Sequence, residues 1–292
     1  MRLAILSNPD SWYFQDLKRA AADRHELVAI PFSQLSATVQ SDGLASFHHQ
    51  QNDLRQFDAV LVRAMPPGSL EQIIFRMDLL GRLEAAGTLV VNTPRALECA
   101  VDKYLTTAKL AAAGLRVPRT IVCQTPQDAL SAFEHLGRDV VVKPLFGSEG
   151  RGIARLTDAA LAERAFRMLS QLGAVLYVQE FIPHHGYDLR LLVIGPKVLA
   201  MRRRSDTDWR TNVSLGGIAE ATELTDELRE LSLTAAEAVG ATIAGVDILP
   251  GTDGKLYAIE VNAVPGWKAL STTLQVDAAE LVLGYLEMQV RR

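Results

Sequence analysis

Residues 245–262 read GVDILPGTDGKLYAIEVN, and three polar side chains there interrupt an otherwise apolar, strand-like pattern. They are Asp247, Glu260 and Asn262. A carboxylate buried in a core is unfavourable unless a cation or a hydrogen-bond partner compensates its charge. Three oxygen-bearing side chains that converge on one place suit Mg²⁺, which prefers oxygen ligands. We therefore interpret the stretch as a strand hairpin that carries a metal site.

The register of this hairpin determines whether the three side chains meet. Residues 251–254, GTDG, have turn composition and predict a four-residue loop, which places Asp247 opposite Ala258. Because side chains alternate between the two faces of a strand, Glu260 and Asn262 then share the face of Asp247. A slip of one residue would send Asp247 to the opposite face. The alternative is that the carboxylates are solvated on an open face of the sheet.

The composition is that of a soluble globular protein whose function lies in local sites. The chain has 292 residues, 48% of them hydrophobic, so it can bury a large core in about two domains. Its formal net charge of -4 gives no general attraction to nucleic acid or anionic lipid. No run approaches the ~18 apolar residues of a membrane span. Cys99 and Cys123, far apart in apolar surroundings, fit reduced thiols, so we expect a cytoplasmic protein without nucleic-acid or membrane partners.

Residues 1–93 alternate between strand and helix patterns, which is typical of a small parallel α/β unit. The expected strands are residues 3–6, 26–30, 59–63 and 89–91, and the expected helices are 11–22 and 70–86. Asn92, Thr93 and Pro94 interrupt this pattern. A domain boundary is therefore expected near Thr93.

Residues 94–180 and 181–292 form the second and third expected units. The second begins with one helical segment over 96–113 and continues with strands 119–123, 140–143 and 175–180 and helices 126–136 and 158–172. The third is expected to contain strands 188–194 and 197–203, a helix over 226–239, the acidic hairpin and a terminal helix over 277–292.

A glycine-rich loop follows a lysine at the end of an expected strand. It reads KPLFGSEGRG from Lys143 and contains Gly147, Ser148, Gly150 and Gly152. Glycine allows backbone N–H groups to approach phosphate oxygens closely. The loop differs from a Walker loop, in which the lysine follows the glycines. A plain turn between two strands is the alternative.

Further cations and polar residues lie elsewhere in the chain. Lys103 begins a helical stretch, and Arg210 follows three consecutive arginines at 202–204, of which alternation sends the middle one to the other face of its strand. Residues 179–182, QEFI, end a strand and offer backbone groups to the edge of a base. Asp188 and Arg190 share one face of the next strand, where they suit a ribose hydroxyl and a phosphate or carboxylate, or else form a structural ion pair with each other.

Together these residues resemble the ATP-grasp ligases, and among them the RimK-like α-L-glutamate ligases. The resemblance covers roughly residues 96–286 and rests on seven elements that occur in order. They are Asp102-Lys103, Lys143-Pro144 with the glycine loop, Gln179-Glu180-Phe181-Ile182, Asp188-Leu189-Arg190, Arg210-Thr211-Asn212 with Gly216-Gly217, Ala244-Gly245-Val246-Asp247, and Glu260-Val261-Asn262 with Pro265-Gly266.

The resemblance implies an ATP-grasp fold of the α/β (α+β) class. Residues 1–93 would be a Rossmann-like pre-ATP-grasp domain, 94–180 the small subdomain with the glycine-rich loop, and 181–292 the C-terminal subdomain with the metal site. The implied nucleotide-binding residues are Lys103, Lys143, Gly147, Ser148, Gly150, Gly152, Glu180, Phe181, Ile182, Asp188, Arg190, Arg210, Thr211 and Asn212. The implied ligands of Mg²⁺, or of Mn²⁺ in its place, are Asp247, Glu260 and Asn262.

The implied reaction joins a carboxylate to an amine. ATP carries about four negative charges, so metal ions and cations must neutralise its repulsion of an approaching carboxylate. The resulting acyl phosphate is attacked by an amine to give an amide, ADP and phosphate. Arg203 or Arg210 would stabilise the oxyanion of the tetrahedral intermediate and act as catalytic residues.

By this resemblance the amino acid is expected to be L-glutamate, added to a small-molecule coenzyme, a peptide or a carrier protein by a homo-oligomeric enzyme. Loops around Trp209 and Trp267 are expected to select the acceptor, with Lys268 exposed on the second loop. Two alternatives stay open. One is a ligase of the D-alanine–D-alanine type or for another amino acid, and the other is a non-catalytic ATP-binding module.

Overall fold

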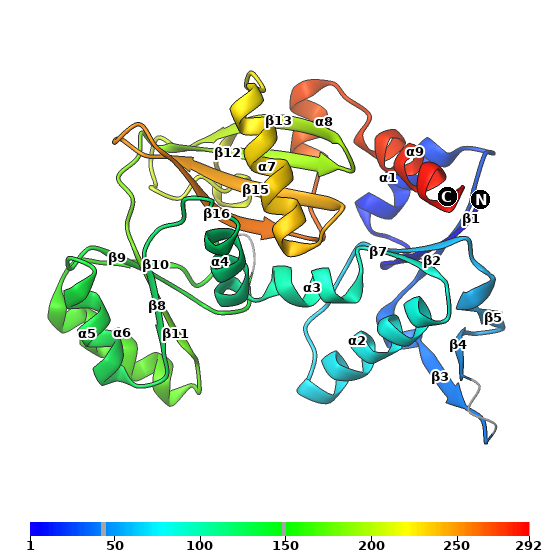
Figure 1. The fold of residues 1–292 in the computed structure, drawn as a ribbon, viewed down its shortest axis with the longest axis horizontal. Helices are drawn as coiled ribbons and strands as arrows, with labels where there is room; N and C mark the ends of the chain where they lie inside the picture. Colours follow the sequence, from blue (N-terminus) through cyan, green and yellow to red (C-terminus); the bar gives the residue numbers. More distant parts are fainter. Residues whose placement is uncertain (42–44, 148–149, 292) are drawn as a thin grey trace.

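The computed structural model describes residues 1–41, 45–147 and 150–291 and has the mixed α/β architecture expected from the sequence (Figure 1). The described residues form three sheets of four or five strands and one small sheet of three. The two ends of the chain lie close together in one lobe (Figure 1). None of the described helices combines the length and the apolar composition that crossing a lipid bilayer requires.

The N-terminal lobe is built on a parallel sheet of order β2-β1-β6-β7. Its elements are β1 (Arg2–Leu6), α1 (Trp12–Ala21), β2 (Glu26–Ile30), β6 (Ala59–Val62), α2 (Leu70–Ala85) and β7 (Leu89–Val91). The expected alternation of strands and helices is confirmed. The segment between β2 and β6, which the sequence patterns did not predict, holds η1 (Phe32–Gln34), β3 (Ser36–Val39), β4 (Ala45–His49), β5 (Asn52–Asp53) and η2 (Leu54–Gln56).

A second lobe consists of an antiparallel sheet of order β10-β9-β11-β8 with two helices on one face. Its elements are β8 (Thr120–Cys123), α5 (Pro126–His135), β9 (Val140–Lys143), β10 (Ala154–Leu156), α6 (Ala159–Gln171) and β11 (Leu176–Glu180). Phe133 and Phe166 of the helices pack on Val142 and Val178 of the strands. Since side chains alternate, the opposite face presents Lys143 and other polar groups.

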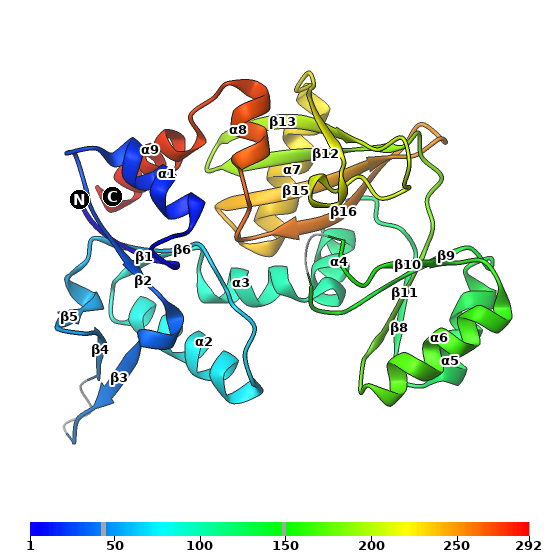
Figure 2. The same ribbon diagram turned by 180° about the vertical axis from the view of Figure 1, so that it is seen from behind.

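The central sheet has the order β14-β13-β12-β15-β16 and is antiparallel throughout. Its strands are β12 (Tyr187–Ile194), β13 (Lys197–Arg204), β14 (Ile218–Ala221), β15 (Ile243–Pro250) and β16 (Leu256–Asn262), and η3 (Val213–Leu215) precedes β14. One face is covered by α3 (Pro94–Val101), α4 (Lys103–Ala112) and α7 (Asp226–Val239). The other is covered in part by α8 (Lys268–Leu274) and α9 (Ala278–Val290), as Figures 1 and 2 show from opposite sides.

This second face of the central sheet is divided along its length. Towards one end, Ile194, Met201 and Ile243 are buried in an apolar core shared with α8, α9 and α1. Towards the other end, the same face carries Asp188 and Asp247. The helices therefore leave the polar half of the face open to a ligand.

In the hairpin of β15 and β16 the two carboxylates lie on one face, as expected, but the pairing of the strands differs from the predicted one. Ala258 pairs with Ile248, one residue out of the predicted register. The register then shifts again, because Ile259 is left unpaired in a β-bulge and Asp247 pairs with Glu260. Directly paired residues point to the same face. The bulge thus corrects a slip that would otherwise have separated the two carboxylates.

The expected single helix over 96–113 is two helices. α3 ends and α4 begins at Asp102, whose backbone is extended (φ -90°, ψ 104°). The Asp102 carboxylate accepts a hydrogen bond from the backbone N–H of Leu105 at 3.0 Å and caps α4. An aspartate at this position satisfies the free N–H groups of the second helix, so the break is stabilised locally.

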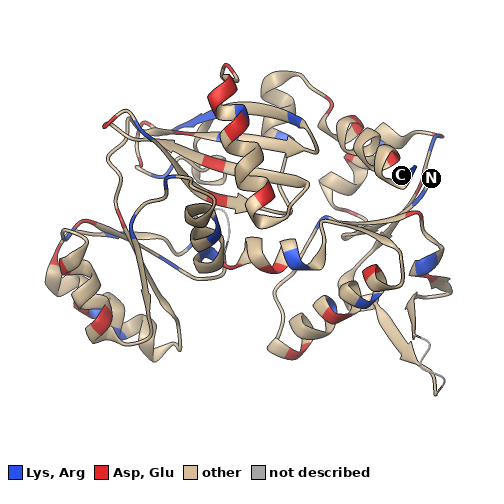
Figure 3. Cartoon of the chain, in the orientation of Figure 1, with Lys and Arg blue, Asp and Glu red and all other residues tan. Residues whose placement is uncertain are grey.

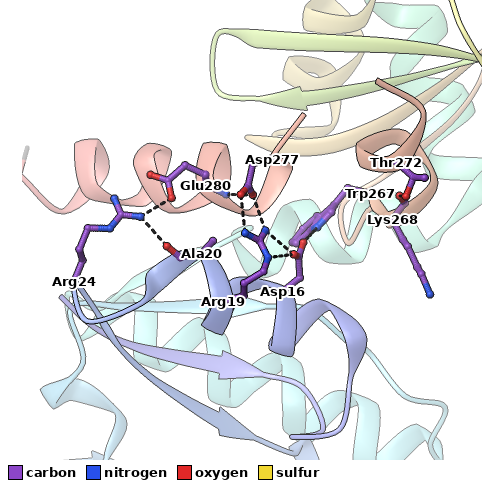
Figure 4. Close-up of polar contacts among 9 residues, drawn as sticks. All are labelled: Asp16, Arg19, Ala20, Arg24, Trp267, Lys268, Thr272, Asp277 and Glu280. Carbon is purple, nitrogen blue, oxygen red and sulfur yellow. Dashed lines mark hydrogen bonds and ion pairs between the residues drawn. The ribbon is translucent and has the colours of Figure 1, made fainter. Parts of the chain in front are cut away.

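The N-terminal lobe is joined to the end of the chain through α1 and α9, which lie side by side (Figure 4). Arg19 of α1 pairs with Asp277 at 2.8 Å, and Arg24 pairs with Glu280. These ion pairs are exposed and contribute little to stability. Leu17 is fully buried in the apolar core beneath them, which supplies most of the attraction.

Trp267, in the loop that was expected to select the acceptor, is part of the same junction. It directly precedes α8, is fully buried, and donates from Nε1 to Asp16 at 2.9 Å (Figure 4). Lys268 is exposed, as expected, but is the first residue of α8. A tryptophan gains more from burial with its N–H satisfied than from exposure on a loop, so it anchors the chain that leaves β16.

Asn92, which follows β7, ties the N-terminal lobe to both strands of the hairpin. Its side-chain amide donates to the carbonyl oxygens of Ile243 at 2.7 Å and Ala263 at 2.6 Å. Its oxygen accepts from the backbone N–H groups of Thr242 at 2.8 Å and Ile243 at 3.1 Å. Because Asn92 is only 2% exposed, these groups have no access to water as an alternative partner.

We predict that Asn92→Ala lowers the free energy of unfolding by about 3 kcal/mol, because several buried backbone groups lose their partner. Urea denaturation measures this change. Asn52→Ala, which removes a single bond to Arg2 near the surface, is the control and should have a much smaller effect. Equal effects of the two substitutions would contradict the role assigned to Asn92.

Candidate active site

A cavity lies where the polar half of the central sheet faces the helix-free side of the second sheet. Figure 3 shows lysine and arginine positions on the segments that meet at this junction, beside the acidic positions of β15 and β16. The predicted site residues that line the cavity are Lys103, Lys143, Gly150, Glu180, Phe181, Ile182, Asp188, Arg203, Arg210, Thr211, Asn212, Asp247 and Glu260.

Four of the predicted residues lie next to the cavity without lining it. The carbonyl oxygen of Gly147 accepts a hydrogen bond from Lys103 at 2.6 Å, and Gly152 forms a turn with φ of +72°. Arg190 lies below the cavity, and the side-chain oxygen of Asn262 accepts from the backbone N–H of Val264 at 2.8 Å. Ser148, the remaining predicted residue, lies outside the described residues.

The carboxylate of Asp247 is held between two guanidinium groups. Arg190 contacts one oxygen at 2.6 Å, and Arg203 contacts the other at 3.0 Å. Burial disfavours the charged carboxylate, but the two arginines outweigh it and hold the pKa of Asp247 below its usual value. Asp247 is therefore ionised at neutral pH.

Arg203 connects this pair to a second carboxylate. It donates to both oxygens of Asp188, at 2.8 and 2.5 Å. Burial disfavours the charge of Arg203, but Asp247 and Asp188 outweigh it and raise its pKa above the usual value. Asp188 and Arg190 therefore both form structural ion pairs, each with a partner on a neighbouring strand and not with each other. Arg202 and Arg204, on the other face of β13, both pair with Glu220.

The acidic residues fit a hard divalent cation by type and by facing. Asp247 and Glu260 are paired across neighbouring strands, and Asn262 is two residues further along the face of Glu260. Among the described residues, no side chain donates a hydrogen bond to Glu260, so its oxygens are available. Asp247 would have to exchange one guanidinium contact for the cation. No cluster of three His, Cys, Asp or Glu side chains occurs in the described residues, and the third candidate ligand is accordingly an amide.

Two lysines face these carboxylates from the other side of the cavity. Lys143, at the end of β9, donates to the side-chain oxygen of Gln179 at 2.7 Å. Burial lowers the pKa of Lys143 to about 8, with nearby Lys103 acting in the same direction and Glu260 against it. Among the described residues, the lysine side of the cavity therefore lacks negative charge. A polyanion that lies between the lysines and the carboxylates would supply it.

The far end of the cavity is aromatic. The ring of Phe181 has the Arg155 guanidinium 3.5 Å from its centre, with Trp209 and His184 at centroid distances of 5.8 and 5.7 Å. The Glu180 carboxylate is held by Arg119, through its backbone N–H at 2.8 Å and its Nε at 2.6 Å. A flat, partly apolar ligand such as a nucleobase suits this end.

Gly150 of the glycine loop and the segment after Arg210 meet at the cavity. A Cβ placed on Gly150 would lie 2.6 Å from the side-chain oxygen of Asn212, and φ there is +71°, so only glycine permits this approach. Arg210 is held by Asp208 at 2.6 Å. The two predicted loops are therefore in contact even though they belong to different lobes.

Sequence reasoning missed or misplaced the roles of several residues of the site. Gln179 was predicted as part of a segment that offers backbone groups to a base, but its side chain accepts a hydrogen bond from Lys143 at 2.7 Å. Trp209 was expected near the acceptor and instead lies beside Phe181. His184 also lines the cavity, and burial lowers its pKa. No sequence pattern indicated Arg155, because it lies on β10, a strand that was not predicted.

Comparison with known families matches the chain along almost its whole length. Residues 1–97 match the RimK PreATP-grasp domain, and residues 100–286 match the RimK-like ATP-grasp domain. Among known proteins, the tetrahydromethanopterin:alpha-L-glutamate ligase of Methanosarcina acetivorans is 32% identical over 315 residues, covering 97% of each chain. The ribosomal protein bS6–L-glutamate ligase of Escherichia coli is 32% identical over 293 residues, covering 98% of this chain and 96% of the other.

Solved structures show the same fold. The ATP-grasp ligase PsnB, in complex with a minimal precursor, has a TM-score of 0.79 and 25% identity, covering 99% of this chain and 98% of that one. A RimK domain ATP-grasp protein from Sphaerobacter thermophilus has a TM-score of 0.74 and 26% identity, covering 98% of this chain and 99% of the other. The ATP-grasp fold with a pre-ATP-grasp domain is thereby confirmed.

We predict that Asp247→Ala lowers the free energy of unfolding by about 3 to 5 kcal/mol in the absence of ligands, because two buried guanidinium groups lose their counter-charge. Chemical denaturation monitored by circular dichroism tests this. Glu220→Ala also removes a carboxylate shared by two arginines, but on the exposed edge of the same sheet, and should have a much smaller effect. A similar small loss for both variants would rule out the buried network as a source of stability.

Proposed function

Because the chain belongs to the RimK-like ATP-grasp family of ATP-dependent ligases, we propose that it joins a carboxylate to the amine of an amino acid with consumption of ATP. The observation that supports this most directly is the placing of charges in one cavity. Lys103 and Lys143 come from one side, and Asp247 and Glu260 come from the other. A triphosphate with its cations needs positive and negative side chains in one cavity. A pocket that binds only a base does not need them.

The two ends of the cavity are proposed to bind different parts of ATP. The aromatic end around Phe181 is proposed to hold the adenine, next to the backbone that follows β11. Lys143 and Lys103 are proposed to bind phosphate oxygens, together with backbone N–H groups near Gly147 and Gly150. Arg210, Thr211 and Asn212 line the side of the cavity that meets this loop.

Asp247, Glu260 and Asn262 are the proposed ligands of Mg²⁺. When bound, Mg²⁺ neutralises charge on the transferring phosphoryl group. Glu260 is the best placed of the three to bind it, because no described side chain competes for its oxygens. Arg203 is anchored by Asp188 and Asp247 and holds a fixed positive charge beside the reacting groups, where the oxyanion of the tetrahedral intermediate would form.

We propose that the amino acid is L-glutamate. The two relatives named above are both glutamate ligases over nearly the full length of this chain, which supports the proposal. Their acceptors differ, one being tetrahydromethanopterin and the other a ribosomal protein. The acceptor of this chain is proposed only as a carboxylate-bearing coenzyme, peptide or protein. The homo-oligomeric state and the division at residues 93 and 180 stay predictions.

An ADP-release screen tests the proposed function. Purified protein is incubated with ATP, Mg²⁺, each of the common amino acids and a panel of acceptors that includes reduced pterin coenzymes and peptides ending in glutamate. We expect ADP release to depend on an amino acid and an acceptor together, with product masses increased by one or more glutamyl units. ATP binding without ADP release in any mixture would instead indicate a non-catalytic module, and release with D-alanine alone would indicate a dipeptide ligase.

We predict that Glu260→Ala reduces turnover at least about 100-fold, because several kcal/mol of charge stabilisation in the transition state are lost with the metal. Steady-state ADP release measures turnover, and circular dichroism verifies the fold. The substitution should leave the unliganded protein folded, because no described side chain donates a hydrogen bond to Glu260. Glu220→Ala, on the same sheet but outside the cavity, is the control, and equal activity of the two variants would refute the metal assignment.

A further inference from the structure

Arg63 is a buried arginine with no carboxylate partner among the described residues. It follows β6 and is only 5% exposed. One of its N–H groups, on Nη2, donates to the carbonyl oxygen of Pro265 at 2.7 Å. Its Nε is fully buried and has no hydrogen-bond partner. A guanidinium carries five N–H donors, so most of its donor capacity is unused in a place where burying a charge is unfavourable.

The surroundings of Arg63 keep it charged and hold its plane in place. The guanidinium lies 4.1 Å from the ring centre of Trp267 and 5.0 Å from that of Tyr13. Burial lowers the pKa of Arg63 to about 10, which still leaves it protonated at neutral pH. Two aromatic rings and one carbonyl group orient the charge without neutralising it. Among the described residues no acidic group neutralises this charge, so Arg63 is available to an anion from outside the chain.

The topology of the N-terminal sheet places Arg63 where ligands bind in open α/β sheets. From β1 the chain moves to β2 on one side and later returns to β6 on the other, so the order reverses between β1 and β6. Such a switch point opens a crevice at the carboxyl ends of the two strands. Arg63 is at that end of β6, and its backbone N–H donates to the carbonyl oxygen of Leu6, the last residue of β1, at 3.1 Å.

The residue that accepts the hydrogen bond of Arg63 is close along the chain to a proposed metal ligand. Pro265, which accepts its hydrogen bond, is three residues after Asn262. Three residues span at most about 10 Å. Gly266 brings its backbone against Tyr13, since a Cβ there would lie 2.4 Å from the tyrosine oxygen. The chain that leaves β16 therefore packs directly against Arg63 and its neighbour Tyr13.

We propose that Arg63 binds a non-reacting carboxylate of one of the two substrates and so positions that substrate for the reaction at the metal strands. This inference rests on the proposed function. A guanidinium and a carboxylate match in geometry and charge, and a shielded pair of this kind is stronger than one in water. The carboxylate belongs either to the incoming amino acid or to the acceptor, and the experiment below separates the two sources.

Arg76 provides a matched control in the same lobe. It is 7% exposed, donates to the carbonyl oxygen of Pro66 at 2.7 Å and lies 5.6 Å from the ring centre of Phe32. It therefore shares with Arg63 the burial, the proline carbonyl and the aromatic contact. It lies on α2 and contacts the segments that follow β6 and the edge strand β2, whereas Arg63 contacts the chain that leaves β16.

The test compares wild type, Arg63→Met, Arg63→Lys and Arg76→Met. Steady-state assays give the KM of ATP, of the amino acid and of the acceptor, and thermal denaturation gives the stability of each variant. For Arg63→Met we expect the KM of one substrate to rise about 10- to 100-fold, with the KM of ATP unchanged. Arg63→Lys should recover part of the loss. Arg76→Met should change thermal stability as much as Arg63→Met does but leave every KM within about twofold.

The source of the carboxylate follows from which KM rises. If the amino acid is affected, L-glutamine and isoglutamine replace L-glutamate, and the amide that is insensitive to Arg63→Met identifies the carboxylate that Arg63 binds. If the acceptor is affected, its amide is used in the same way. A functioning enzyme in which neither substrate KM depends on Arg63, or in which Arg76→Met has the same effect, overturns the inference and leaves the proposed function intact.

Calorimetric titration tests the binding of a carboxylate by Arg63 without enzymatic turnover. Wild type and Arg63→Met are titrated with L-glutamate and succinate, and with L-glutamine and succinamide as uncharged counterparts. Binding of a carboxylate that Arg63→Met weakens at least about tenfold supports the inference, even if no mixture yields ADP and the proposed function fails. Equal binding by the two proteins, or no binding of either carboxylate to wild type, overturns it.

Discussion

The buried contact of Asp247 with Arg190 and Arg203 is the interaction on which the site depends. It joins three neighbouring strands of the central sheet, β12, β13 and β15, on one face. A charge network of this kind replaces apolar packing over half of that face, so no helix can cover it. The open half of the face is what the second sheet approaches, and the cavity between them follows from this polarity. Stability and ligand binding therefore share the same residues.

The rest of the molecule holds the acidic hairpin in place. Asn92 bonds to the chain on both sides of its open end, and the bulge at Ile259 brings its two carboxylates to one face. Trp267 anchors the chain beyond β16 against the N-terminal lobe. The N-terminal lobe thus contributes to the site by fixing the chain that leaves β16 and, as we propose, by the carboxylate contact of Arg63.

Much of the site was readable from residue type and order. Asp247 and Glu260 are recognisable because charged groups in apolar strands require a partner, and the glycine loop is recognisable because Lys143 precedes it. The order of seven motifs pointed to the ATP-grasp fold. Local patterns also located most helices and strands, since hydrophobic periodicity is a property of neighbouring residues. They missed short strands such as β10 and the break at Asp102, where a single capping residue outweighs helix propensity.

The bonding partners of the charged side chains could be assigned only from the folded structure. Asp188 and Arg190 look like a pair in sequence, yet each bonds to a strand that arrives later in the chain. The predicted register of the hairpin was also wrong by one residue at Ile248, and only the bulge at Ile259 brings the two carboxylates to one face. Composition and alternation specify which side chains are polar and which face they share, because both depend on adjacent residues. Which charge meets which, and which charge stays unpaired as Arg63 does, depends on contacts between residues far apart, and these exist only after the sheets have packed.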